Sequence, residues 1–321
     1  MNIKALIIPA LALLIFPSTV QASSGGTSTA QTYKISPSPR AAAMGETFSS
    51  FGADMTSLFY NPSAAGYADR MGAAFSHSSL FGEVSYNFLS FSKELRDEKG
   101  GYALSVAWLD SGAIPLTQAS SRGLYTGTDG SFNATSLLAA ITGGARIGDN
   151  CRLGMTLKYL KETIAVYGSD NIAADLGVTY GFLNDRMRFN LSILNNSLGK
   201  IKFINEESVA PRTNRFGLEG RVTKTFILAC EMEKVFDGDA KLHYGAEFEL
   251  KGLLLRAGYN PASGENTGTG VTAGLGLKHK DLFFDYAFLP AGDLGVTQKL
   301  SVGLKFGEDP SSDIEPSEWW Q

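Results

Sequence analysis

Cysteine, histidine and long apolar runs are scarce in this chain. The 2 cysteines, Cys151 and Cys230, stand in separate segments, and the 3 histidines show no ligand spacing with them or with carboxylates. We therefore expect neither a disulfide framework nor a metal site. After residue 22, no apolar run approaches the eighteen or so residues of a membrane-spanning helix. A helical membrane protein is excluded.

Charge is also sparse and nearly balanced. The formal net charge is -4, and no block of basic residues occurs. Nucleic acid is therefore not expected as a partner. The mean hydropathy of -0.03 is that of a soluble protein, but a barrel that places apolar residues at every second position gives the same value.

The N-terminus has the pattern of a secretory signal peptide. Lys4 precedes an apolar stretch over residues 5–16, and Val20-Gln21-Ala22 forms an A-x-A-like cleavage site. The stretch is short for a membrane anchor, and no cysteine follows the site to accept a lipid. We expect residues 1–22 to be removed and the mature chain to start at Ser23.

Polar and apolar residues alternate in most segments from residue 71 to residue 306. In the last segment, Leu300, Val302, Leu304 and Phe306 share one face, and Ser301, Gly303 and Lys305 share the other. A strand with lipid on one side and water on the other has this pattern. About fourteen such segments occur, beginning near Met71, Glu83, Gly101, Phe132, Cys151, Asn171, Arg186, Thr213, Thr225, Lys241, Leu253, Val271, Asp281 and Val296. The sequence therefore predicts an all-β protein, a transmembrane antiparallel β-barrel of about 14 strands in the outer membrane.

The lengths of the connections support this interpretation. Long segments rich in Gly, Ser, Thr and Asn (111–131, 195–212 and 260–270) follow odd-numbered strands. Most connections after even-numbered strands are tight (149–150, 183–185, 251–252 and 279–280), apart from the charged segment 93–100. Long extracellular loops and short periplasmic turns place both ends of the barrel in the periplasm. A secreted β-sandwich is the alternative, but it would not require this parity.

Catalysis has little support in the sequence. The sequence has a local excess of inward-facing carboxylates, of the kind an outer-membrane hydrolase would use, at Glu231, Glu233, Glu247 and Glu249. Polar residues are the ordinary filling of a barrel lumen, however, and nearby arginines (Arg186, Arg188, Arg215 and Arg221) balance them. No G-x-S-x-G motif is present. We expect no enzyme activity, no catalytic residues and no cofactor.

The segment before the first strand differs in composition. Residues 39–48 have the pattern of a short helix or turn, and residues 52–66 show no two-residue period while being too apolar for a periplasmic tail. A barrel of about fourteen strands would otherwise enclose an aqueous channel. We therefore expect this segment to lie inside the lumen as a hatch.

The same segment carries a family resemblance. Residues 40–45, 52–54 and 58–64 (RAAAMG, GAD and LFYNPSA) resemble the N-terminal motif of the PorV/PorQ and UPF0164 families, which are related to FadL-type fatty-acid transporters. Residues 285–301 (DYAFLPAGDLGVTQKLS) resemble the closing hairpin of the PorV/PorQ proteins, and residues 255–260 (LRAGYN) fit a preceding strand. Gln298-Lys299 stands where those families usually show His-Arg.

The resemblance implies a fourteen-stranded barrel with an N-terminal hatch, and it implies one of two functions. FadL-type members take up hydrophobic small molecules such as fatty acids through a lumenal pocket, whereas PorV-type members serve type IX protein secretion. The expected partners are thus outer-membrane lipid and a hydrophobic small molecule, or secretion-system proteins. The candidate residues for the hatch and ligand site are Met44, Gly45, Phe48, Phe59, Tyr60, Asn61 and Pro62. Asn61 and Pro62 are also explained by a tight turn that positions the hatch without touching a ligand.

The predicted organisation has four parts. These are the signal peptide (1–22), the N-terminal segment and hatch (23–70), the transmembrane barrel (71–306) and a periplasmic tail (307–321). The acidic tail ends in Glu318-Trp319-Trp320-Gln321. It is either a disordered extension or a contact for a periplasmic partner, since paired tryptophans are typical of interfaces.

Overall fold

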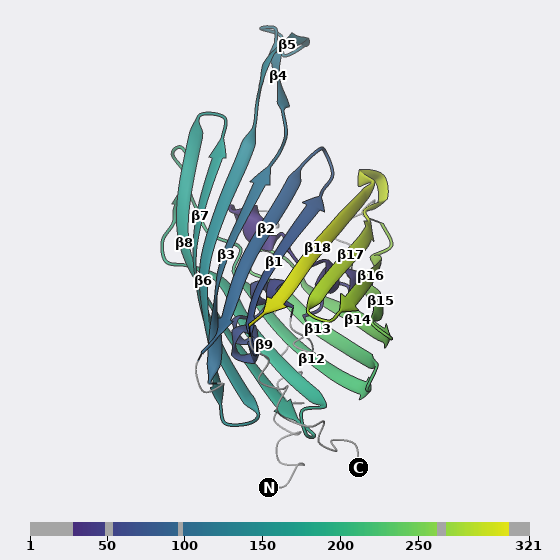
Figure 1. The fold of residues 1–321 in the computed structure, drawn as a ribbon. Coiled ribbons are helices and arrows are strands. Elements are labelled where there is room, and N and C mark those ends of the chain that lie inside the picture. Colours follow the sequence, from purple (N-terminus) through teal and green to yellow (C-terminus); the bar gives the residue numbers. More distant parts are fainter. Residues whose placement is uncertain (1–27, 49–53, 96–98, 262–267, 308–321) are drawn as a thin grey trace.

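The computed structural model describes residues 28–48, 54–95, 99–261 and 268–307. The predicted signal peptide and residues 308–321 of the predicted tail lie outside these ranges. Within them, fourteen strands form one closed antiparallel barrel (Figure 1). The barrel closes where β1 (Met71–Ser79) pairs with β18 (Val296–Phe306). The predicted barrel class is confirmed, and a β-sandwich is excluded.

The remaining strands of the wall follow in chain order. They are β2 (Ser85–Glu94), β3 (Gly100–Asp110), β6 (Ala134–Ile147), β7 (Cys151–Ile164), β8 (Tyr167–Phe182), β9 (Met187–Ser197), β12 (Thr213–Thr223), β13 (Phe226–Val235), β14 (Ala240–Leu250), β15 (Leu253–Tyr259), β16 (Val271–His279) and β17 (Leu282–Pro290).

The two-residue period of the sequence matches the two faces of the wall. In β18, Leu300, Val302 and Leu304 are exposed on the outside, while Lys299 and Ser301 are buried on the inside. The same alternation of exposed apolar and buried polar residues recurs in β8 and β14. The face that binds lipid can therefore be read from the sequence.

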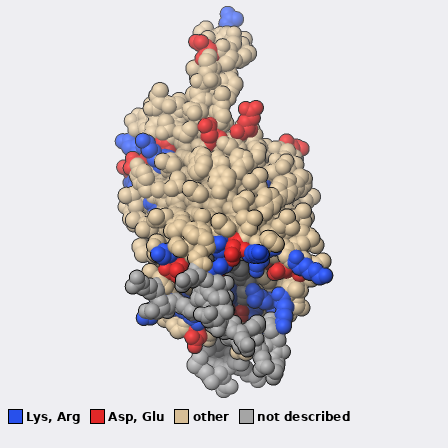
Figure 2. All heavy atoms as spheres, in the orientation of Figure 1, with Lys and Arg blue, Asp and Glu red and all other residues tan. Residues whose placement is uncertain are grey.

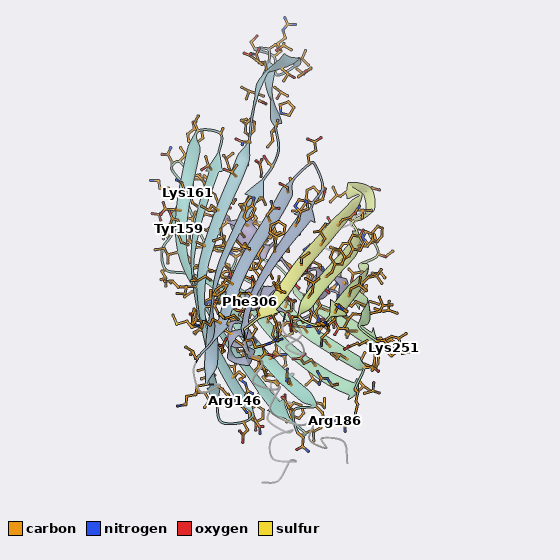
Figure 3. All side chains as sticks on the ribbon, viewed as in Figure 1. Arg146, Tyr159, Lys161, Arg186, Lys251 and Phe306 are labelled. Carbon is orange, nitrogen blue, oxygen red and sulfur yellow. The ribbon has the colours of Figure 1, made fainter. Side chains whose placement is uncertain are left out.

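The outer surface is that of a membrane protein. Figure 2 shows a broad band with few charged side chains, with Lys, Arg, Asp and Glu gathered towards its two ends. Arg146 and Arg186 lie near the bottom of the view and Lys251 at its right edge, each in or beside a short turn (Figure 3). An apolar belt between charged rims is stable only in a bilayer, and a closed barrel leaves no backbone group unpaired there. The protein is located in the outer membrane.

The long connections carry two small sheets of their own. β4 (Ile114–Ala119) and β5 (Tyr125–Phe132) form a hairpin that projects well beyond the barrel (Figure 1). β10 (Ile201–Lys202) pairs with β11 (Glu207–Ser208) in the connection between β9 and β12. The sequence pattern did not predict either sheet. The β4–β5 hairpin lies at the end with the longest connections, opposite the short turns, and long loops of such barrels are extracellular.

The wall is much taller on one side than on the other. β6 and β7 have 14 residues each and β8 has 16, whereas β15 has 7 and β16 and β17 have 9 each. Figure 1 shows the tall strands on the left and the short ones on the right.

Within the described ranges, the helices are all short. They are η2 (Gln31–Lys34), α2 (Pro39–Ala43), η3 (Met55–Phe59), η4 (Pro62–Tyr67) and η6 (Gly292–Leu294). Among the described residues, no helix is long and apolar enough to cross a membrane.

Candidate functional site

Residues 28–48 and 54–70, here together called the lumenal segment, lie inside the barrel. Within this segment, α2 contacts β15 to β18, η3 contacts β1 and β2, and η4 contacts β3, β6, β7 and β8. These strands lie on different sides of a closed wall, so one short segment can reach all of them only from within. Most of its side chains are accordingly buried, including Met44, Tyr60 and Asn61.

Two groups of wall glycines let the backbone of the lumenal segment approach the wall directly. Gly245, Gly258 and Gly274 lie against residues 43–45, and a Cβ on Gly258 would lie 2.0 Å from the Gly45 nitrogen. On another part of the wall, Gly144, Gly154 and Gly177 lie against residues 61–66. There, a Cβ on Gly154 would lie 2.1 Å from the Pro62 carbonyl carbon. Side chains at these wall positions would exclude the lumenal segment from its place.

Four of the predicted site residues fix the path of the lumenal segment. Gly45 has φ 70°, its N–H donates to Thr272 Oγ1 at 3.1 Å, and His243 Nδ1 donates to its carbonyl at 2.8 Å. Asn61 caps η4 by accepting from the Ser63 N–H at 3.0 Å, and Pro62 occupies the first helical position. Met44, between these wall contacts, is fully buried. The turn geometry expected of Asn61 and Pro62 is present.

The other three predicted residues are aromatic. The Phe48 N–H donates to Glu231 Oε2 at 3.1 Å. Phe59 and Tyr60 meet edge to face with ring centroids 5.7 Å apart. Both line a cavity of about 1110 Å³ on the extracellular side, here called the outer cavity, whose other lining residues are largely polar or charged. Only these two of the seven candidates therefore reach a cavity large enough for a ligand.

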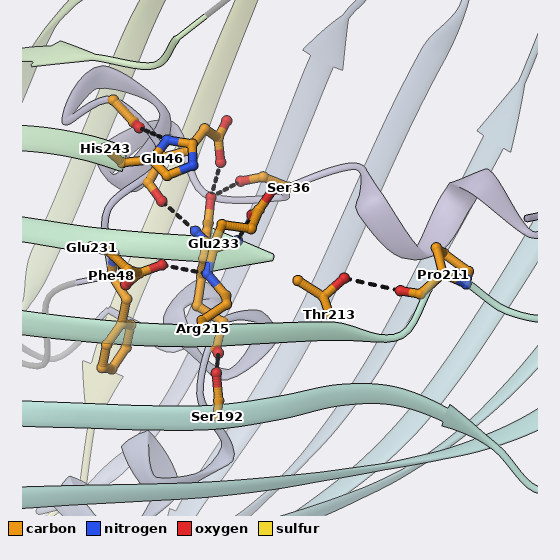
Figure 4. A network of polar contacts seen from close by, with 12 residues as sticks. Ser36, Glu46, Phe48, Ser192, Pro211, Thr213, Arg215, Glu231, Glu233 and His243 are labelled. Carbon is orange, nitrogen blue, oxygen red and sulfur yellow. Dashed lines mark hydrogen bonds and ion pairs between the residues drawn. The ribbon is translucent and has the colours of Figure 1, made fainter. Parts of the chain in front are cut away.

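A charged cluster holds the lumenal segment beside this cavity (Figure 4). Arg215 pairs with Glu231 and Glu233 and donates to the Glu46 carbonyl at 2.6 Å. Tyr60 donates a hydrogen bond to Glu46. Burial opposes ionisation of Glu46, but the nearby Lys299, the Tyr60 hydroxyl and Arg215 outweigh it and hold the pKa of Glu46 below its ordinary value. Glu46 is therefore a carboxylate at neutral pH.

A second ion cluster binds the lumenal segment on the periplasmic side. Glu247 accepts from Arg40 Nε and Arg256 Nε, each at 2.7 Å, and Arg256 also pairs with Asp285 at 2.6 Å. The sequence predicted Glu247 as an inward carboxylate but did not identify Arg40 or Arg256 as its partners. The sequence offered one indication that Arg40 has a specific contact, which is its position at the start of the family-like motif (residues 40–45).

One part of the inner wall is apolar. Tyr86 and Phe88 on β2, Ala107 on β3, Leu138 on β6, Leu160 on β7 and Ala173 on β8 form a buried cluster, here called the apolar patch. Elsewhere the inner face is mainly polar, for example at Ser76, Ser90, Thr179, Asn190 and Ser192. The apolar patch is thus a local departure from the polar filling of a barrel.

The two-residue period did not predict this patch, although the sequence contains a signal for it. Phe88-Leu89, Leu137-Leu138 and Tyr159-Leu160 are adjacent apolar pairs that break the two-residue period. In each pair one residue faces lipid and the other faces the lumen.

The apolar patch is covered. Ala30 and Tyr33 of the lumenal segment, with Ile201 and Ala210 of the connection between β9 and β12, belong to the same buried cluster. A cavity of about 20 Å³ remains at its edge, beside Leu58 and Phe59. That volume suits a single water molecule. A hydrocarbon therefore cannot enter without displacing a residue that covers the patch.

Comparison with known proteins defines the architecture further. No family model matches the chain, and no curated protein matches its sequence. Solved structures do match. The toluene transporter TbuX of Ralstonia pickettii has a TM-score of 0.62 and 13% identity, with 84% of this chain and 98% of that chain covered. The CymD monoaromatic hydrocarbon channel has a TM-score of 0.61 and 13% identity, with the same coverage of both chains. A Pseudomonas aeruginosa FadL homologue has a TM-score of 0.57 and 9% identity, with 85% of this chain and 99% of that chain covered.

These matches establish a shared fold. The resemblance to FadL relatives in the sequence is supported at that level. The alternative of a PorV/PorQ-like secretion component rests on the sequence resemblance alone. Among the described residues, no group of three or more His, Cys, Asp or Glu side chains is placed to hold a metal ion.

Proposed function

We propose that the protein is an outer-membrane channel for the uptake of small hydrophobic, fatty-acid-like molecules, and that the lumenal segment is the hatch that closes its lumen to water-soluble solutes. In this proposal Met44, Gly45, Phe48, Asn61 and Pro62 position the hatch. Phe59 and Tyr60 border the route between the outer cavity and the apolar patch.

The apolar patch is the observation that carries this proposal. A barrel that only admitted polar solutes would not need six apolar residues gathered on its inner wall. Ligand sites for hydrophobic molecules are mostly apolar concavities with a few polar groups to orient the ligand. The patch with Lys158 and Thr142 at its edge has this composition.

The matched structures support the same class of substrate. TbuX is a toluene transporter and CymD is a monoaromatic hydrocarbon channel. Both have this barrel, which makes hydrophobic uptake the first function to test.

Uptake is tested by binding of a graded series of fatty acids to the protein in lipid nanodiscs. Each additional buried CH₂ contributes about 0.8 kcal/mol, so affinity should rise about fourfold per carbon until the site is full. Phe88→Ala should weaken binding about tenfold or more, because a patch side chain is lost. Ser90→Ala, on the same inner face of β2, should leave binding unchanged. A response that is flat with chain length would contradict hydrophobic uptake.

The hatch is tested separately by deletion of residues 44–66. The strands close without this segment, so a folded barrel of higher conductance in planar bilayers is expected. Unchanged conductance in a deletion variant shown to be folded would contradict the hatch and leave the uptake proposal standing.

A further inference from the structure

The side chain of Tyr33 fills the apolar patch in the way that a ligand would. Tyr33 is 1% exposed. Its hydroxyl donates to Asn171 Oδ1 at 3.0 Å, and the Lys158 ammonium lies 5.6 Å from its ring centroid. The wall thus surrounds one phenol ring with apolar residues, places a cation over its face and supplies an acceptor for its hydroxyl.

The wall groups that contact Tyr33 are held by other wall residues. Asn171 Nδ2 donates to Ser197 Oγ at 2.7 Å, which directs the amide oxygen of Asn171 to Tyr33. Lys158 pairs with Asp175 at 2.6 Å and donates to Asn195 Oδ1 at 2.9 Å. These contacts do not involve Tyr33, so the slot keeps its shape and polarity when Tyr33 leaves.

The residues that carry Tyr33, 28–36, are here called the strap, and they are held differently from the rest of the lumenal segment. Ser28 donates to Asp237 from its N–H at 2.9 Å and its hydroxyl at 2.6 Å. Thr32 Oγ1 donates to Ser136 Oγ at 2.9 Å, and Lys299 donates to the Ser36 carbonyl at 2.9 Å. The wall glycines that receive residues 43–45 and 61–66 have no counterpart beneath the described strap.

Space for movement of the strap lies next to it. The outer cavity of about 1110 Å³ is lined by Lys34 and Ser36 at one end of the strap and by Phe59 and Tyr60. The strap can therefore leave the patch for this cavity without displacing the glycine-supported parts of the segment.

We propose that Tyr33 is a built-in occupant of a binding slot for a phenol-sized aromatic ring, and that an incoming phenol takes this slot by displacing the strap into the outer cavity. The inference rests on the proposed uptake function and names a substrate class for it. A hydroxylated ring is preferred over the bare hydrocarbon, because the buried Asn171 oxygen loses its donor when a ring without a hydroxyl binds.

The first experiment measures binding of 4-fluorophenol and fluorobenzene by ¹⁹F NMR to protein in lipid nanodiscs, with empty nanodiscs as the blank. Tyr33→Ala vacates the slot, so 4-fluorophenol should bind at least tenfold more tightly than to the wild type. It should also bind about fivefold more tightly than fluorobenzene, which is the contribution of one buried hydrogen bond. Tyr102→Ala, which removes a tyrosine from the lipid face of β3, should bind as the wild type does.

A second substitution tests the hydroxyl contact. Adding Asn171→Ala to Tyr33→Ala should abolish the preference for 4-fluorophenol while fluorobenzene still binds. A preference that persists without Asn171 would overturn the assigned slot.

The movement of the strap is tested with the wild-type Tyr33 in place. Thr32→Cys with Ser136→Cys, in a background without Cys151 and Cys230, puts two sulfurs where oxygens now lie 2.9 Å apart. Oxidation should abolish 4-fluorophenol binding, and reduction should restore it. Equal binding in both redox states would overturn strap displacement. If fatty acids bind with the expected chain-length dependence while neither fluorinated ring binds to any variant, the phenol slot fails and hydrophobic uptake stands.

Discussion

The docking of η4 over wall glycines gives a sharp test, because two adjacent glycines of β6 face opposite sides of the wall. A Cβ on Gly144 would lie 2.4 Å from the Gly66 nitrogen and 2.8 Å from the Ala65 Cβ, whereas a Cβ on Gly143 would meet nothing within 4 Å. Ordinary contacts of this kind are no closer than about 3.4 Å, so Gly144→Ala must push η4 away by roughly an ångström. Overpacking of this size costs about 1–3 kcal/mol.

This cost falls on the docked state of η4 and not on the barrel. One to three kcal/mol corresponds to a roughly 5- to 150-fold larger population with η4 undocked. Hydrogen exchange of the η4 amides should accelerate by that factor in Gly144→Ala, while the amides of β6 keep their protection. Gly143→Ala is the matched control and should leave exchange in η4 unchanged. Unchanged exchange in Gly144→Ala would refute the argument that these glycines are required for docking.

Three further outcomes are expected. Glu247→Gln should destabilise the docked lumenal segment by about 3–5 kcal/mol, since Arg40 and Arg256 would lose a buried anionic partner. Hydrogen exchange of the α2 amides measures this loss, and Glu249→Gln is the control. Burial alone would raise the pKa of Asp237, but the two hydrogen bonds from Ser28 hold it below its ordinary value. The Ser28 contact therefore stabilises the docked strap fully at any pH above the ordinary aspartate pKa, and this stabilisation is lost as the pH falls through the lowered pKa of Asp237. The strap amides should lose protection from hydrogen exchange only below about pH 4. Equal protection at pH 3 and pH 7 would contradict this. The closed strand ladder should also give a heat-modifiable protein, with unheated and boiled samples differing in gel mobility, and helical circular dichroism without a mobility shift would count against the barrel.

The strands of the barrel wall could be predicted from the sequence better than the contacts of the lumenal segment. Residues such as Leu300 and Ser301 have to face lipid and lumen in turn, and this local requirement repeats along each strand. The strand beginnings near Met71, Cys151 and Leu253 could therefore be predicted closely. β8 begins at Tyr167 and not near Asn171, because its extracellular end continues beyond the residues in which polar and apolar side chains were expected to alternate.

The lumenal contacts could not be predicted in the same way. Arg40 meets Glu247 across 207 positions of sequence, and nothing local to either residue specifies the other. Gly144 and Gly143 look identical in sequence, and only the register of β6 places one beneath η4. Two candidates, Phe59 and Tyr60, lie at the cavity, while the other five support the path of the chain. The family-like motif identifies the lumenal segment, but its contacts with the barrel wall determine which of its residues line a cavity.

The unequal height of the wall sets how the barrel and the bilayer adjust to each other. A strand tilted by about 40° rises roughly 2.5 Å per residue along the membrane normal, so the 16 residues of β8 span about 40 Å and the 7 residues of β15 about 18 Å. The apolar band of such barrels is about 25 Å tall. The β8 side therefore stands well clear of the lipid, while the β15 side is too short for it. Thinning of the bilayer beside β15 or a tilt of the whole barrel relieves this hydrophobic mismatch, so the barrel and the lipid around it are not symmetric about the barrel axis.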